Sequence, residues 1–191
     1  EGSLVESVMP GSQIPVYFVE QPELFDRDGL YQTRGEDFPD NLERFSFFSQ
    51  AVLELIPQIG WQPDVMHAHD WQTALAIAHL RLTKSADRRW RSVAGIFTVH
   101  NLAYQGLFPK GAWPLTGLPD EAFQVDGLEF YGQINCLKGG LLYADRLSTV
   151  SPTYAQEIQT RARGCGLEGV LQPRCDHLVG ILNGIDVEEW N

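Results

Sequence analysis

The amino-acid sequence predicts an α/β fold, with a Rossmann-like, mainly parallel sheet that has helices on both faces. Two observations predict it. Short apolar runs alternate with longer stretches whose apolar residues recur at three- and four-residue intervals, and most of the turns between them are short. Alternation of this kind predicts right-handed crossovers between parallel strands. We expect residues 1–191 to form a single partial domain, one lobe of something larger.

The first part of the chain contains one early strand and the clearest helix. Residues 14–19 have the β-branched and aromatic content of a strand. The polar, aromatic segment 24–39 is typical of a solvated surface loop. Asp40 is expected to cap a helix whose apolar residues recur from Leu42 to Ile59, and Gly60 should end it.

The middle of the chain contains two further strands. Residues 63–69 form a short apolar run, and a helix is expected over 70–82. A polar connection, 84–91, leads to the central strand 93–100. The following region, to about residue 133, is rich in turn residues and is expected to be irregular.

The last part repeats the strand and helix alternation. A helix is expected over 134–144 and a strand over 146–150, and Ser151 has the side chain of a helix cap. A short helix over 167–172 and a last strand over 177–182 complete the chain.

The composition excludes several classes of partner. Fourteen basic against 25 acidic side chains give a net charge of −11, which disfavours nucleic acid and anionic membrane surfaces. The apolar runs are too short to span a bilayer, and no secretory leader is visible, so we expect a soluble protein. Cys136, Cys165 and Cys175 fit neither a disulfide framework nor a zinc knuckle, which predicts a reducing compartment.

Polar residues follow the predicted strands, and parallel strands place such residues along one rim of the sheet. Several of them have ordinary structural explanations: Asp70 and Ser151 as helix caps, His67 as a core histidine. Those explanations do not account for Trp71 beside Asp70. Aromatic faces with amide and carboxylate edges suit a sugar. The residues at the strand ends are Glu20, His67, His69, Asp70, His100, Asn101, Ser151 and Asn183, and Tyr104 and Gln105 follow His100.

At these residues the sequence closely resembles the family of bacterial glycogen synthases and plant starch synthases. The resemblance runs from about residue 16 to the end of the chain. It is carried by HAHDWQT at 67–73, FTVHNLAYQG at 97–106, GLEFYGQIN at 127–135, SPTYA at 151–155 and LNGID at 182–186.

The resemblance implies a retaining glucosyltransferase with two Rossmann-like lobes, of which this chain is the N-terminal one. The second, nucleotide-binding lobe would lie outside the chain. The donor would be ADP-glucose and the acceptor the non-reducing end of an α-1,4-glucan, with no cofactor and no metal. The resemblance also implies a cytoplasmic enzyme, or a plastid one if the source is a plant.

Site residues follow from the same resemblance. His100 would contact the transferred glucose and present its backbone carbonyl to the anomeric centre, with Asp70 as the second catalytic residue. Trp71 would line the pocket and Asn183 would bond the sugar. Asn101, Tyr104 and Gln105 are further substrate-binding candidates. No side-chain nucleophile is evident near His100, which fits a front-face mechanism better than the two-carboxylate scheme of glycosidases.

The sequence departs from the family at one motif, and two alternative functions remain open. The family's Lys-Thr-Gly-Gly-Leu loop does not occur, since residues 138–141 lack the threonine and lie in a helical pattern. His67, His69 and His100 could instead be the ligands of a metal-dependent hydrolase, although its barrel needs more strands than are visible. A non-catalytic glucan-binding lobe would need the aromatic residues but no precisely placed His100.

Overall fold

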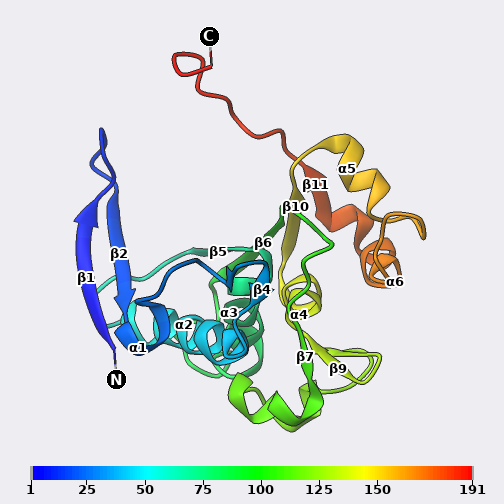
Figure 1. Cartoon of the computed structure of the whole chain (residues 1–191), viewed down its shortest axis with the longest axis horizontal. Coiled ribbons are helices and arrows are strands. Elements are labelled where there is room, and N and C mark those ends of the chain that lie inside the picture. The colour runs from blue at the N-terminus through cyan, green and yellow to red at the C-terminus, as the bar shows by residue number, and fades with distance from the viewer. Residues whose placement is uncertain (1, 191) are drawn as a thin grey trace.

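The computed structural model describes residues 2–190, and at its centre is a parallel sheet of four strands (Figure 1). The strands are β5 (Val65–His69), β6 (Ala94–Val99), β10 (Arg146–Thr149) and β11 (Leu178–Gly180), and they lie in the order β11-β10-β6-β5. All three pairings are parallel, so the four carboxyl ends form one rim. The predicted α/β fold with a parallel sheet flanked by helices is confirmed.

Helices α3 (Asp70–Leu82) and α4 (Cys136–Tyr143) pack against each other and against the sheet face that carries Phe97. Side chains alternate along β5: Met66 and Ala68 are buried, whereas His67 and His69 on the other face are exposed. This alternation leaves two histidines of β5 open to solvent beside the rim.

Three short helical segments connect β10 to β11: α5 (Pro152–Glu157), α6 (Glu168–Leu171) and η3 (Gln172–His177). The Ser151 hydroxyl accepts a hydrogen bond from the Tyr154 N–H at 2.9 Å, which confirms the predicted cap. The last strand is shorter than predicted and ends at Gly180.

The early strand belongs to a separate sheet. β2 (Pro15–Glu20) pairs with β1 (Ser3–Val8) as an antiparallel hairpin, and Figure 1 shows the hairpin standing apart from β5. The expectation that Glu20 joins the rim is therefore wrong, and its carboxylate instead accepts a bond from the Ser3 hydroxyl at 3.0 Å. Alternating side chains indicate a strand but do not identify the strand with which it pairs.

The predicted first helix is α2 (Asn41–Leu55), and it ends before Ile59. The chain leaves it by a series of turns that reach Gly60, whose φ is +72°. Asp40 occupies the predicted N-cap position, but its side chain makes no capping bond, because its carboxylate accepts hydrogen bonds of 2.9 and 3.0 Å from the Arg27 guanidinium. Before α2 lie α1 (Pro22–Phe25), β3 (Gln32–Thr33) and β4 (Glu36–Asp37).

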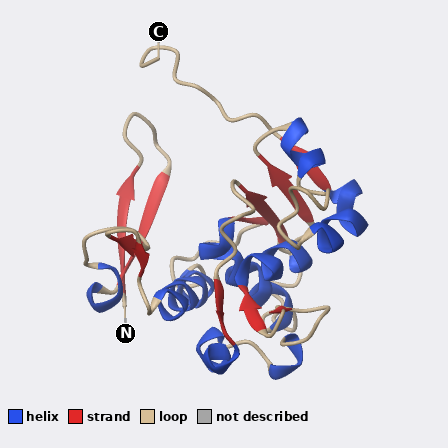
Figure 2. Ribbon diagram, turned by 45° about the vertical axis from the view of Figure 1, so that its right-hand side comes forward, coloured by secondary structure: helices blue, strands red, loops and turns tan. Residues whose placement is uncertain are grey.

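The region expected to be irregular contains a small antiparallel sheet, which Figure 2 shows separate from the parallel one. Trp113 and Leu128 from this region are buried in the main core. The helix expected from residue 134 begins at Cys136, because Ile134 belongs to a strand. The elements are β7 (Leu107–Pro109), η1 (Lys110–Thr116), η2 (Asp120–Ala122), β8 (Glu129–Phe130) and β9 (Gln133–Asn135).

The close approach of α4 to the sheet depends on Gly140, which gives a first prediction. A Cβ at this position would lie 2.5 Å from the fully buried ring of Phe97. We expect Gly140→Ala to lower the free energy of unfolding by about 1–3 kcal/mol, measured by urea denaturation. Gly169→Ala in α6 is the matched control, because nothing lies within 4 Å of that added methyl group. Equal stability of the two variants would contradict the packing described.

Candidate active site

The rim brings together the two residues predicted to be catalytic. His100 follows β6, and Asp70 follows β5 on the neighbouring strand. The Asp70 carboxylate accepts a hydrogen bond from the backbone N–H of His100 at 2.8 Å. The His100 ring also meets a second rim residue, since its Nε2 lies 3.1 Å from Nδ1 of His69. His100 is therefore held at its backbone and at its ring.

Asp70 has an unusual backbone conformation that directs its side chain to this bond. Its φ is +56°, in the left-handed region that most side chains avoid and that Asp tolerates better. The N-cap position of α3 is His69, so the alternative of Asp70 as a helix cap is wrong. The carboxylate is engaged across the rim and not along its own helix.

The loop after His100 is held by hydrogen bonds on both sides. The Asn101 side-chain oxygen accepts from the N–H of Ala103 at 3.0 Å, and the hydroxyl of Tyr154 accepts from the N–H of Leu102 at 3.0 Å. Within residues 2–190, no hydrogen bond involves the carbonyl oxygen of His100. The site thus presents a backbone dipole that is fixed in place yet has no protein partner.

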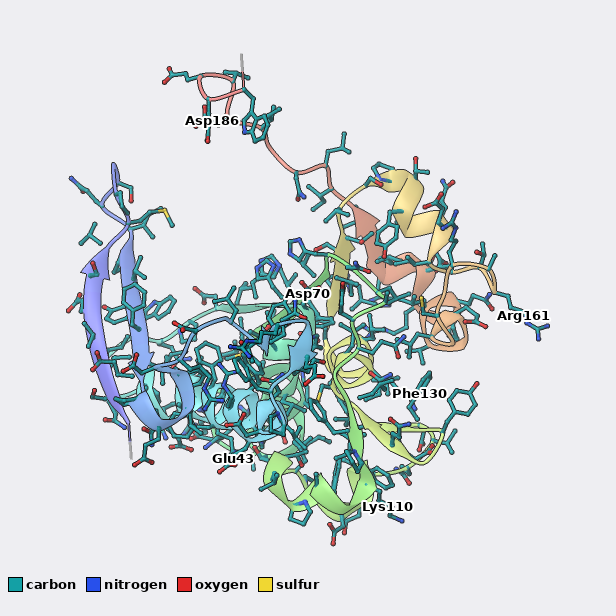
Figure 3. All side chains as sticks on the ribbon, viewed as in Figure 1. Glu43, Asp70, Lys110, Phe130, Arg161 and Asp186 are labelled. Carbon is teal, nitrogen blue, oxygen red and sulfur yellow. The ribbon has the colours of Figure 1, made fainter. Side chains whose placement is uncertain are left out.

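A cavity of about 430 Å³ adjoins this rim, and five of its lining residues were predicted to be site residues. Figure 3 shows Asp70 near the centre of the molecule, where the strands and helices converge. Tyr104 is 62% exposed and is available to a ligand. The five predicted residues are Asp70, Trp71, Asn101, Tyr104 and Gln105.

Trp71 and Gln105 are more firmly tied to the protein than their predicted roles suggest. The buried Trp71 ring meets Phe45 edge to face, with centroids 5.0 Å apart. The Gln105 amide accepts from Asn135 at 2.7 Å and donates to the carbonyl of Cys165 at 3.0 Å. Both side chains build the cavity wall, and a direct bond from Gln105 to a ligand would require it to exchange a partner.

The cavity also contains residues that sequence analysis did not select. Tyr31 and Asp37 come from the segment predicted to be a solvated loop, Gln72 lies within the motif at 67–73, and Phe108 lies just after the motif at 97–106. The sequence feature that could have indicated Tyr31 as a cavity residue was its aromatic side chain in a polar loop. Only the tertiary fold brings that loop against α3.

Asn183 is not brought to the rim. It is exposed and lies in the segment after β11, which runs away from the sheet in Figure 1. Figure 3 places Asp186, further along this segment, well apart from Asp70. The expectation of a shared rim therefore holds for His69 and His100 but not for Asn183, whose contact with a sugar stays a prediction.

The histidine arrangement contradicts the metal-hydrolase alternative. Nε2 of His67 bonds the hydroxyl of Thr98 at 2.6 Å, and the facing nitrogens of His69 and His100 bond each other. His67 is thus engaged away from the other two rings, and within the described residues no group of three or more His, Cys, Asp or Glu side chains could hold a metal ion. Burial, followed by the neighbouring histidines, lowers the pKa of His67 and of His69, and both rings are neutral near pH 7.

Comparisons with known proteins show the family to which the chain belongs. The family of starch synthase catalytic domains matches residues 3–173. Glycogen synthase 2 of Geobacter sulfurreducens is 53% identical over 178 residues, and the glycogen synthase of Paramagnetospirillum magneticum is 47% identical over 196 residues. The catalytic domain of Starch Synthase IV from Arabidopsis thaliana, bound to ADP and acarbose, has a similar structure with a TM-score of 0.81 at 32% identity.

The chain is shorter than these proteins. The matches cover 93% of the chain and 37% of the Geobacter protein, 100% and 39% for the Paramagnetospirillum protein, and 100% and 42% for the Arabidopsis chain. Across residues 2–190, no helix is both long and apolar enough to cross a membrane.

Proposed function

The chain belongs to the family of starch synthase catalytic domains, and from this premise we propose that it is the N-terminal lobe of a retaining glucosyltransferase. The intact protein transfers glucose from ADP-glucose to the non-reducing end of an α-1,4-glucan. A second lobe, outside this chain, binds the nucleotide. The matched proteins are more than twice as long as the chain, which supports a second lobe.

The observation that carries the proposal is the carbonyl of His100. Positive charge develops at the anomeric carbon as the glycosidic bond to the diphosphate breaks. A fixed carbonyl dipole beside that carbon stabilises the transition state more than the ground state. Asp70 fixes the peptide group before His100, and Asn101 shapes the loop after it, so little reorganisation is needed during the reaction.

The sugar ligands are proposed from the cavity and from the relatives. Exposed Tyr104 offers a face on which a glucose ring can stack, and Asp70 and Asn101 offer polar edges to its hydroxyls. The Arabidopsis enzyme in its complex holds ADP, which supports an adenine nucleotide donor. The bacterial relatives and the three free cysteines support a cytoplasmic location.

The same geometry favours catalysis over simple glucan binding. A non-catalytic lobe would need Tyr104 and the cavity, but it would have no use for a carbonyl held between two anchored segments. The left-handed conformation of Asp70 carries a backbone cost that a binding surface does not require.

The test is transfer of labelled glucose to glycogen by the full-length protein, with ADP-glucose and UDP-glucose as alternative donors. We expect faster incorporation from ADP-glucose, into α-1,4 linkages. The 191-residue chain alone should show no turnover, because half a cleft cannot close and its net charge of −11 disfavours a diphosphate. Absence of transfer from either donor would refute the function. Equal turnover by the chain alone would refute its assignment as one lobe.

A further inference from the structure

His69 has no assigned part in the reaction, yet the structure ties it directly to His100. The two rings meet at an Nδ1 to Nε2 distance of 3.1 Å, with centroids 5.3 Å apart and planes inclined by 37°. This is hydrogen-bond geometry between two imidazoles. The contact spans two neighbouring strands, because His69 ends β5 and His100 follows β6.

His69 is itself firmly placed. The hydroxyl of Thr73 accepts from its N–H and donates to its carbonyl, both at 2.6 Å. Its ring stacks on His67 with centroids 4.2 Å apart. His67 is fixed by Thr98 at 2.6 Å, and Thr98 is fixed by Ser148 at 2.5 Å. A line of polar contacts across three strands therefore supports the ring that meets His100.

A hydrogen bond between two imidazoles requires one protonated and one bare nitrogen. Two N–H groups or two lone pairs would repel each other at this distance. The contact therefore couples the two rings, because a proton on Nε2 of His100 requires a bare Nδ1 on His69, and a bare Nε2 requires a proton on that Nδ1. Nδ1 of His100 is then the nitrogen that remains for a ligand.

We propose that His69 is a positioning residue, which holds His100 in one ring orientation and selects one tautomer, so that Nδ1 meets a sugar hydroxyl. The assignment of a sugar as the ligand of Nδ1 rests on the proposed function. The coupling of the two rings does not, because it follows from their contact.

The first experiment measures the tautomer in the chain itself, by ¹⁵N spectra of labelled histidines at neutral pH. The two nitrogens of His100 should have widely separated shifts, as in a single tautomer. His69→Leu removes the partner and should bring these shifts towards an average. His69→Asn places an amide at the position of Nδ1 and should restore the separation. Unchanged His100 shifts in His69→Leu would overturn the proposal.

The second experiment measures glucosyl transfer by the full-length protein. His69→Leu should lower kcat about ten- to a hundredfold with little change in KM, and His69→Asn should recover most of it. The control is His177→Asn, at the end of η3 just before the opposite edge strand β11, where His177 contacts Arg146. Equal kcat of the Leu and Asn variants would overturn the positioning role. A wild-type protein without transfer would refute the proposed function, while the spectra would still decide the tautomer.

Discussion

Replacing His100 by alanine in the full-length protein is expected to lower kcat by about two to three orders of magnitude. The substitution removes the ring that we propose contacts the reacting sugar, and it removes the contact with His69. The rim side chain is exposed, so the free energy of unfolding should change by less than about 0.5 kcal/mol.

Initial rates of glucose transfer and urea denaturation of the same preparations check this prediction. His177→Ala is a matched control, because it removes an exposed imidazole from the opposite edge of the same sheet. Wild-type kcat in His100→Ala would remove His100 from the site. A large loss of stability would assign it a structural role instead.

Substitutions of Asp70 should separate its hydrogen bond from its backbone conformation. Asp70→Ala loses the bond to the His100 N–H and places a methyl group at a φ of +56°. We expect a fall in kcat of about a hundredfold and a loss of about 1–2 kcal/mol of stability. Asp70→Gly should lose the activity but not the stability, since glycine accepts this φ.

Asp70→Asn is the conservative variant in this series. Asparagine tolerates the left-handed region, and its amide oxygen can accept the same hydrogen bond, so stability and much of the activity should be retained. The measurements are kcat and urea denaturation for all three variants. Equal activity in the Ala and Asn variants would show that the bond to His100 does not matter for catalysis.

The parallel sheet could be predicted because its strands are encoded locally. The runs that form β5, β6 and β10 are short segments next to helical patterns, and in the sequence each is followed within two residues by a polar residue. Ser151 could be predicted as a cap because a cap contacts only the next turn of its own helix.

The failures depend on partners that are distant in sequence or in space. Asp40 has a side chain that often caps a helix, but its carboxylate accepts a hydrogen bond from Arg27 and not from the helix backbone. Gln105 is polar and beside His100, but Asn135 and Cys165 occupy its amide. Neither competitor belongs to the local pattern on which the prediction was based.

The placement of the candidate site residues could be predicted only in part, because several features of the site also depend on residues that are distant in sequence. His100 and Asp70 each follow a strand, and parallel strands bring such residues to one rim. The bond between them, the left-handed conformation of Asp70 and the contribution of Tyr31 to the cavity arise only when the elements pack. Asn183 follows a strand as well, but its segment leaves the sheet after Gly180.

The most direct test of the sugar site is a titration of the full-length protein with ADP-glucose. It is observed through the NMR signals of the imidazole rings of the five histidines in residues 1–191. We expect the signals of His100 and His69 to shift together as donor is added. His79, buried against the carbonyl of Thr116, and His177, at the opposite edge of the sheet, should stay unchanged. Saturable donor binding that leaves the signals of His100 and His69 unmoved would contradict the account.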